Sequence, residues 1–184
     1  MAGDVSNPRV WINADVYTAP YGSVYPGTTG ESWPIAWEAV GLLHEDGMTE
    51  HREDEVTDHY AWGGILVRTT KSKHKRTFAF GMLEDNSVVF NLVNPGSVEL
   101  TQLGETTRDV KVPDTNIVAF GFEFVDGTTI KRRIVPRAEI VEVGDVLYSD
   151  AELAYYPVTV NVYPDADGVL YHDIMNDDQA AVAS

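Results

Sequence analysis

Cysteine is absent from the 184 residues of this chain. That absence excludes disulfides, thiolate catalysis and cysteine-based zinc sites, and it suits a protein that folds in a reducing cytoplasm. Because 43% of the residues are hydrophobic, a chain of this length can bury one sizeable core. We therefore expect a single domain over residues 1–184, held together by packing alone.

Long apolar runs are also lacking. No stretch approaches the ~20 apolar residues that a membrane span requires. The N-terminal sequence MAGDVSNPRV has neither the basic start nor the apolar stretch of a signal peptide. We expect a soluble, unexported protein that does not insert into a membrane.

Positive charge is scarce, with 13 Lys and Arg against 29 Asp and Glu, a formal net charge of −16. Because affinity for phosphates comes from Lys and Arg, this balance argues against ordinary nucleic-acid binding. Beyond Arg137 the chain has no Lys or Arg at all, so basic segments of one copy are suited to face acidic segments of another. Nine of the thirteen cations lie in two short groups: Arg68, Lys71, Lys73, Lys75 and Arg76, and Lys131, Arg132, Arg133 and Arg137.

Catalytic motifs are missing as well. The chain has no Gly-x-Ser-x-Gly elbow, no phosphate-cradling glycine loop and no His-Glu-x-x-His pair. The acidic run Glu53 to Glu55 fits a solvated loop better than a catalytic dyad. The histidines of that region match no zinc spacing, and Pro164 to Gly168 lacks the remaining acids of a calcium loop, so it reads as a turn. We predict a protein that is not an enzyme and has no cofactor or metal.

Alternating apolar residues dominate the rest of the sequence and predict strands. One strand is expected near the N-terminus in RVWINADVYTAP, and a hairpin is expected around Asp126-Gly127. The basic stretch KSKHK, residues 71–75, is interpreted as an exposed hairpin connection. With about seven or eight strands in total, the predicted fold is mainly β: a β-sandwich or barrel of short antiparallel strands with one flanking α-helix.

The helix is expected between Met82 and Asn94. Apolar residues recur near helical spacing, Asp85, Asn86 and Ser87 are suitable caps, and Asn94-Pro95-Gly96 stops the segment.

Three segments stand apart from this pattern. Residues 17–34 form a Gly- and Pro-rich extended arm whose aromatic residues we expect to order only on a neighbouring subunit. Residues 41–64 are interpreted as an acidic loop region, with seven carboxylates and one arginine between Leu42 and Gly64. Trp62, beside this region, is expected to be a core aromatic at the start of a strand. Residues 175–184 are interpreted as a flexible C-terminal tail.

The order of these segments resembles a known family. An N-terminal strand ending in Ala-Pro and a Gly/Thr/Pro-rich arm are followed by LLHEDG, EDEVTDHYAWG and FAFGMLEDN, with the helix after the last. Together they resemble the major tail tube proteins of long-tailed, siphovirus-type phages, and most closely those of phages infecting actinobacteria. None of these motifs is catalytic; the likeness lies in their order and spacing.

The resemblance implies a structural virion protein that forms hexameric rings and stacks them into a hollow tail tube, through which genomic DNA reaches the host. It implies assembly in the bacterial host cytoplasm and residence in the virion tail. The implied partners are other copies of the chain, a tape measure protein, a tail terminator and distal tail or tip proteins. Double-stranded DNA would pass through without specific binding.

A DNA conduit explains an acidic surface, because a wall of carboxylates repels a polyanion. The acids proposed to line the lumen, or alternatively to meet the basic hairpin of a neighbouring ring, are Glu50, Glu53, Asp54, Glu55 and Asp58; a second candidate strand carries Glu139 and Glu142. The residues proposed to contact other subunits are Tyr21, Tyr25 and Trp33 together with the nine clustered cations.

Two other functions fit parts of the sequence. A β-sandwich ligand- or carbohydrate-binding module, such as a phage decoration or adhesion domain, would use Trp33, Trp62 and the tyrosines as contact residues. An acidic hydrolase would use two of the many carboxylates, and it would require a deep pocket holding one carboxylate of raised pKa.

Overall fold

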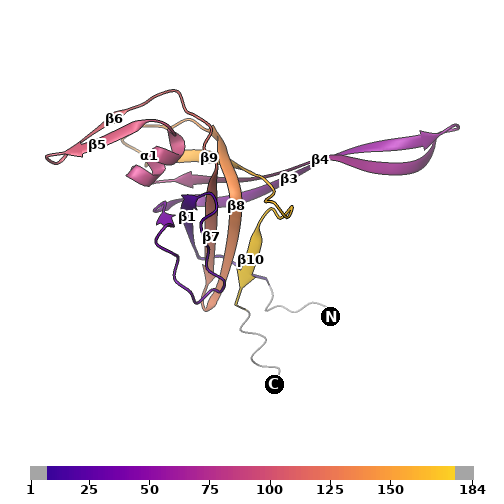
Figure 1. Ribbon diagram of the computed structural model, residues 1–184, viewed down its shortest axis with the longest axis horizontal. Helices are drawn as coiled ribbons and strands as arrows, with labels where there is room; N and C mark the ends of the chain where they lie inside the picture. The colour runs from indigo at the N-terminus through magenta and orange to yellow at the C-terminus, as the bar shows by residue number, and fades with distance from the viewer. Residues whose placement is uncertain (1–7, 177–184) are drawn as a thin grey trace, which may run out of the picture.

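The computed structural model describes residues 8–176. Its body is one eight-stranded antiparallel sheet in the order β2-β1-β7-β8-β9-β4-β3, with β10 paired to β8 (Figure 1). A separate two-stranded sheet holds β5 and β6. The predicted mainly β fold with one short helix is confirmed. The elements are β1 (Asn13–Pro20), β2 (Glu38–Ala39), β3 (Leu43–Ala61), β4 (Ile65–Met82), α1 (Ser87–Val93), β5 (Val98–Gln102), β6 (Glu105–Asp109), β7 (Val118–Asp126), β8 (Thr129–Val143), β9 (Tyr156–Val162) and β10 (His172–Met175).

Strand β8 joins the two layers of the curled sheet. Its first half pairs with β7 on one side and β10 on the other, so that Ile134 lies opposite both Gly121 and His172. Its second half pairs with β9, where Glu139 lies opposite Asn161. Figure 1 shows β7 and β8 running across the direction of β3 and β4. The sheet therefore folds over itself and encloses its core between these two layers.

The core consists of alternate residues on the facing strands. Phe78 and Phe80 on β4 meet Phe122 on β7, with ring centroids 5.1 and 5.7 Å from that of Phe122. Helix α1 adds Val89 and Leu92 to the same cluster. Burying each such side chain contributes roughly 1.5–3 kcal/mol, so this cluster is a main source of the stability of the body.

Helix α1 begins at one of the predicted caps and ends at the predicted stop, but Met82, which was expected within it, is the last residue of β4. The Asn86 side chain accepts a hydrogen bond from the Val89 backbone N–H at 2.9 Å, which satisfies a donor that the first turn leaves free. At the other end, the Asn94 N–H donates to the Phe90 carbonyl, and Pro95 cannot continue the helix. The Asp126-Gly127 hairpin is confirmed as well, since it joins β7 to β8 with Gly127 at a φ of 61°.

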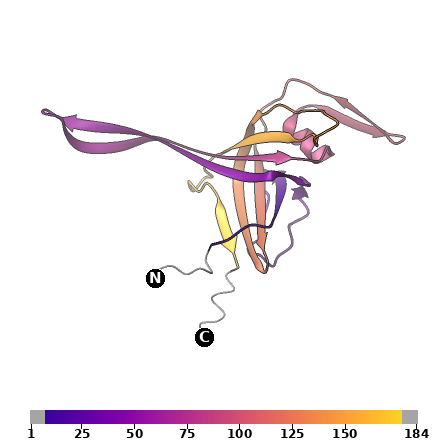
Figure 2. The same cartoon turned by 180° about the vertical axis from the view of Figure 1, so that it is seen from behind.

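The acidic segment is a strand, and the interpretation of residues 41–64 as a loop is wrong. Strand β3 pairs with β4 from Leu43↔Met82 to Ala61↔Ile65, and the pair projects far beyond the body (Figures 1 and 2). The basic stretch 71–75 lies inside β4 and is not a hairpin connection. The connection is Trp62-Gly63-Gly64, where both glycines have positive φ. Trp62 is fully exposed at this tip, so the expectation of a core aromatic is also wrong.

A second projecting hairpin, β5–β6, was not predicted. Its turn, Leu103-Gly104, has φ values of 52° and 85°, the positive pair that a two-residue hairpin loop with the right twist requires. Arg108 holds it to the body, because its guanidinium pairs with Glu99 and Asp85 and lies 4.7 Å from the Phe90 ring centre. In Figure 1 this hairpin points away from the body on the side opposite the long one.

The C-terminal region is ordered further than predicted. Met175 belongs to β10, and the Asn176 side chain accepts a hydrogen bond from the Ile130 backbone. The rest of the predicted tail, residues 177–184, lies outside the described residues. Among residues 8–176, no helix has the length and apolar character needed to cross a membrane.

Candidate assembly surfaces

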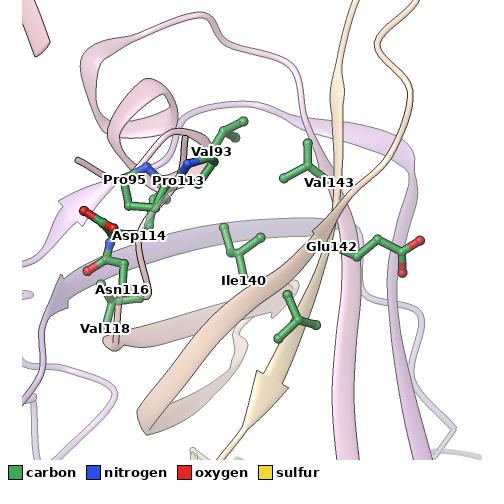
Figure 3. A pocket seen from close by; sticks show the side chains of 11 residues that line it. Val93, Pro95, Pro113, Asp114, Asn116, Val118, Ile140, Glu142 and Val143 are labelled. Carbon is green, nitrogen blue, oxygen red and sulfur yellow. The ribbon is translucent and has the colours of Figure 1, made fainter. Parts of the chain in front are cut away.

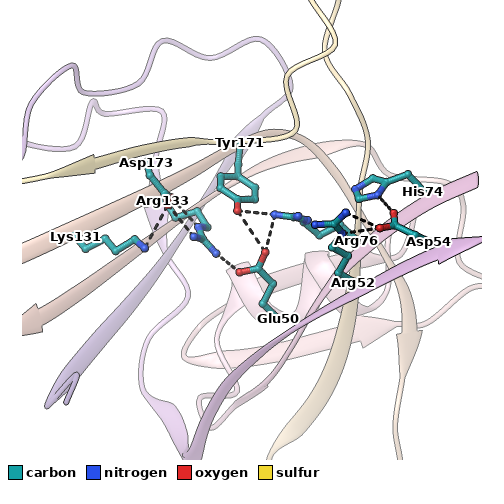
Figure 4. Close-up of polar contacts among 9 residues, drawn as sticks. All are labelled: Glu50, Arg52, Asp54, His74, Arg76, Lys131, Arg133, Tyr171 and Asp173. Atoms are coloured by element: carbon teal, nitrogen blue, oxygen red, sulfur yellow. Dashed lines mark hydrogen bonds and ion pairs between the residues drawn. The ribbon is translucent and has the colours of Figure 1, made fainter. Parts of the chain in front are cut away.

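The root of the long hairpin is fastened to the body by a charged network (Figure 4). Arg133 on β8 donates two parallel hydrogen bonds of 2.7 Å to the Asp173 carboxylate on β10. The same guanidinium pairs with Glu50 on β3, which also accepts from Arg76 on β4 at 2.9 Å. The Tyr171 ring lies 4.1 Å from the Arg133 guanidinium carbon. The hairpin strands β3 and β4 therefore meet β8 and β10, which lie far from them in the sequence, at one ion-pair cluster.

The cluster sets the protonation of Asp173. Burial alone raises the pKa of this carboxyl, but the hydrogen bonds from Arg133 and the nearby charge of Lys131 lower it more, so the net pKa lies below its usual 3.8. Burial also lowers the pKa of Arg133, and the carboxylates around it outweigh that effect and raise it. Both groups are therefore charged throughout the neutral range.

A dependence of stability on pH follows from the lowered pKa of Asp173. Its ion pair contributes fully above the unfolded-state pKa of about 3.9, and the contribution is lost as pH falls through the lower folded-state pKa. Below about pH 4, we expect the free energy of unfolding to decrease less with falling pH in Asp173→Asn than in the wild type. Urea denaturation between pH 7 and pH 3 measures this difference. Asp167→Asn, at an exposed turn, should retain the wild-type profile. Identical acid profiles for wild type and Asp173→Asn would contradict this account.

Further along the hairpin, acids on β3 face cations on β4. The Asp54 carboxylate accepts hydrogen bonds from His74 and Arg52. These bonds lower its pKa to about 2, and the bond from His74 has the larger effect. Glu55 pairs with Lys73 at 2.6 Å. Glu53 lies opposite Lys75 in the strand register, and Asp58 accepts from the Thr69 hydroxyl at 2.6 Å. These acids were expected either to line the lumen or to meet the basic residues 71–75 of a neighbouring ring. Within one chain, residues 71–75 lie on β4, where they already face the acids of β3.

The arm after β1 folds back on its own chain. The Trp33 ring stacks on Tyr17 with centroids 4.5 Å apart, and its indole N–H donates to Glu123 at 3.2 Å. The Tyr25 ring stacks on His172. Both rings therefore have partners within their own chain, and the contact of Tyr25 and Trp33 with a neighbouring subunit stays a prediction. Tyr21, at 55% exposure, remains available for contact.

Arg132 holds this arm in place. Its guanidinium pairs with Glu123 and donates to the backbone carbonyls of Thr28 at 2.9 Å and Glu31 at 2.7 Å. It also lies 5.1 Å from the Trp33 ring centre. Arg132 is 5% exposed and Arg133 8%, so the assignment of these two cations to contacts between subunits is wrong, because their charges are satisfied inside one chain.

One face of the sheet formed by β3, β4, β9 and β8 points away from the core. Two rows of side chains cross it in register: Glu142, Thr159, Ala79 and Thr49, and Glu139, Asn161, Thr77 and His51. An irregularity at Val141 places Glu139 and Glu142 on the same face, although their spacing in a regular strand would put them on opposite faces. Thr49, Ala79 and Glu142 are exposed, so this part of the sheet lacks a covering element within the described chain.

This four-stranded sheet also has two open edges. Strand β3 ends the sheet order, and within residues 8–176 it pairs only with β4. On β8, the pairing with β7 ends at Ala138, so in the described part of the chain residues 139–143 pair with β9 alone. Unpaired backbone along a strand edge is a template for a strand from another chain.

A shallow hollow lies between α1 and β8, next to the face just described (Figure 3). Its cavity is about 240 Å³, and its lining is largely apolar, with Val93, Pro113 and Ile140 among the lining residues. The two carboxylates at its rim, Asp114 and Glu142, point in different directions in Figure 3. They do not form the carboxylate pair that an acidic hydrolase requires.

The structure thus has several surfaces suited to contacts with other chains. They are the open strand edges, the uncovered sheet face and the two projecting hairpins. A family model described as phage tail tube protein matches residues 1–184, and the chain belongs to that family. It is therefore a structural protein of the phage tail. The resemblance seen in the sequence is confirmed at this level.

Two solved structures share the fold with 10% sequence identity. One is the sheath-tube complex of an extracellular contractile injection system in its extended state, with a TM-score of 0.50 over 94% of this chain and 93% of that chain. The other is the sheath/tube terminator of the same kind of system, with a TM-score of 0.50 over 95% of this chain and 100% of that chain. No curated protein matches the sequence significantly.

Proposed function

We propose that this chain forms hexameric rings that stack into the hollow tail tube through which phage DNA is delivered to the host. The observation that carries the proposal is the open-edged sheet of β3, β4, β9 and β8. Pairing of the β3 edge of one copy with residues 139–143 of the next continues the sheet from subunit to subunit. Repetition of one such heterologous contact closes a ring.

The uncovered face of this sheet then becomes the wall of the lumen. Glu142 is exposed on it, and Glu139 lies beside it with its carboxylate accepting from the Tyr163 hydroxyl at 2.9 Å. Glu53 lies further out on the same face, opposite Lys75. Glu50 and Asp54 point to the other face of the hairpin and are neutralised by cations there, so we assign the lumen to Glu139 and Glu142 first.

The finer assignments rest on the sequence resemblance. It supports a long-tailed phage of actinobacteria, assembly in the host cytoplasm, a tape measure protein inside the tube and tip proteins at the distal end. A terminator at the head end has additional support, because one of the similar structures is a sheath/tube terminator.

Negative-stain electron microscopy of the purified protein, across a range of concentration and salt, tests the proposal. We expect hollow tubes or stacked six-fold rings, with assembly weakened at high salt where ion pairs join subunits. A protein that stays monomeric on a sizing column across the whole range would contradict it.

A further inference from the structure

We propose that the tip of the β3–β4 hairpin of one copy docks onto an acidic patch at the opposite end of a second copy. The hairpin tip comprises residues 60–68, and the acidic end patch comprises residues 144–155 with the pocket beside them. This inference rests on the proposed self-assembly and identifies the surfaces that make one of its contacts.

The hairpin tip is apolar, and among residues 8–176 no other segment packs against it. Trp62 is 104% exposed, and Ile65, Leu66 and Val67 are between 52% and 68% exposed. A two-stranded ribbon is marginally stable by itself, and contiguous exposed apolar side chains mark interaction sites. A protruding tryptophan is also the residue type most often found as the anchor of an interface. The tip is therefore built to be covered by another molecule.

The acidic end patch offers a matching apolar surface. In the segment between β8 and β9, Leu147, Tyr148 and Leu153 are each more than 60% exposed. Beside them lies a cavity of about 580 Å³, lined by Leu43, His44, Glu45, Leu83, Glu152, Leu153 and Tyr155. One wall is fixed, because the His44 and Tyr155 rings stack with centroids 4.1 Å apart. This cavity has room for an indole ring.

The charges of the two surfaces are complementary. The patch contains Asp145, Asp150 and Glu152, and no Lys or Arg follows Arg137 anywhere in the sequence. Next to the tip, β4 carries Arg68 and then Lys71, whose side chain is 67% exposed. Opposite charges around an apolar centre orient two partners and favour their encounter. The β3 acids beside these cations already have partners within the hairpin, because Asp54 pairs with Arg52 and Lys71 and Asp58 accepts from Thr69.

The two surfaces lie at opposite ends of one subunit. The patch leads into β9 at Tyr156, which pairs with Met82 at the end of β4, whereas the tip contains the beginning of β4 at Ile65. Figures 1 and 2 both show the hairpin projecting from the side of the body opposite α1 and the β8–β9 connection. The tip of a subunit therefore cannot reach the acidic end patch of the same subunit, and the contact repeats head to tail from copy to copy.

Cysteine pairs test this contact directly, because the native chain has no cysteine. In tubes of the double variant Trp62→Cys/Leu153→Cys, mild oxidation should give a ladder of disulfide-linked chains on a non-reducing gel. Mixed single variants should give cross-linked dimers and no higher species. The control Leu103→Cys/Leu153→Cys, with its first cysteine at the fully exposed β5–β6 turn, should give no ladder.

Tubes that form without a ladder would overturn the contact and leave the proposed function standing. Failure of the wild-type protein to form tubes would instead overturn the proposed function, and this inference with it. As a second measurement, Trp62→Ser should raise the critical concentration for assembly about tenfold or more, as expected for an interface anchor, without changing thermal unfolding. Leu103→Ser is its matched control, and an unchanged critical concentration for Trp62→Ser would also overturn the contact.

Discussion

Replacement of Arg132 by methionine is expected to lower the free energy of unfolding by about 3–5 kcal/mol, because it leaves a buried carboxylate without its partner. The Glu123 side chain is only 15% exposed, and the carbonyls of Thr28 and Glu31 lose their donors at the same time. Methionine keeps the aliphatic stem, so the change isolates the guanidinium. Chemical denaturation measures the loss, and limited proteolysis should show cleavage between residues 21 and 37.

A matched control for this change is Lys73→Met on the long hairpin. The Lys73 side chain is 78% exposed in its ion pair with Glu55, so its loss should cost no more than about 1 kcal/mol. A double-mutant cycle with Glu123→Gln isolates the coupling between Arg132 and Glu123. Equal free energies of unfolding for Arg132→Met and Lys73→Met would show that the contacts of Arg132 do not hold the arm in place.

Glu142→Lys is expected to slow DNA ejection from phage particles by about tenfold or more while tubes still assemble. Each lysine that reaches a phosphate contributes on the order of 1 kcal/mol at 4 Å in water, and the contact is repeated in every ring. A dye that reports released DNA after triggered ejection measures the rate. The effect should shrink as salt is raised, because screening weakens the new attraction.

Glu142→Gln is the isosteric control, and it should slow ejection much less because it adds no cation to the wall. Asp167→Lys makes the same reversal of charge at an exposed turn outside the four-stranded face. Equal ejection rates for Glu142→Lys and wild type, in normal tubes, would place Glu142 outside the lumen.

Short-range signals in the sequence predicted much of the fold. Asn86 as a cap, Pro95 as a stop and Asp126-Gly127 as a turn act through backbone geometry within a few residues, so the sequence alone identifies them. The N-terminal strand was predicted from alternation, since one of its faces packs on the core. These are the places where local preference and tertiary structure agree.

The long hairpin was missed because most of its length has no core to pack against. Both faces of its outer half meet solvent, so the apolar alternation that marks a strand is absent. A different signal was present. Charges mirror one another about Gly64, with Glu53, Asp54 and Glu55 on one side matching Lys75, His74 and Lys73 on the other. Complementary charges at equal distances from a glycine turn are typical of a hairpin held by cross-strand pairs.

The buried arginines were missed for another reason. Arg132 and Arg133 are adjacent in a basic run, which normally predicts a solvated turn. In β8 their side chains point to opposite faces, so Arg132 fastens the arm on one side and Arg133 fastens β3 and β10 on the other. The partners come from segments up to 104 residues away, and no local pattern reveals them.

The length of the hairpin has a mechanical consequence. Its strands have 19 and 18 residues, and at roughly 3.3 Å per residue they reach about 60 Å. In a tube of such subunits, a hairpin of this length would contact several neighbours, so a bending force or internal pressure would be distributed among them. Removal of one subunit would then require all of its contacts to break together. Small domains without covalent bonds between them can thus form a tube that is flexible and does not readily lose subunits from its ends.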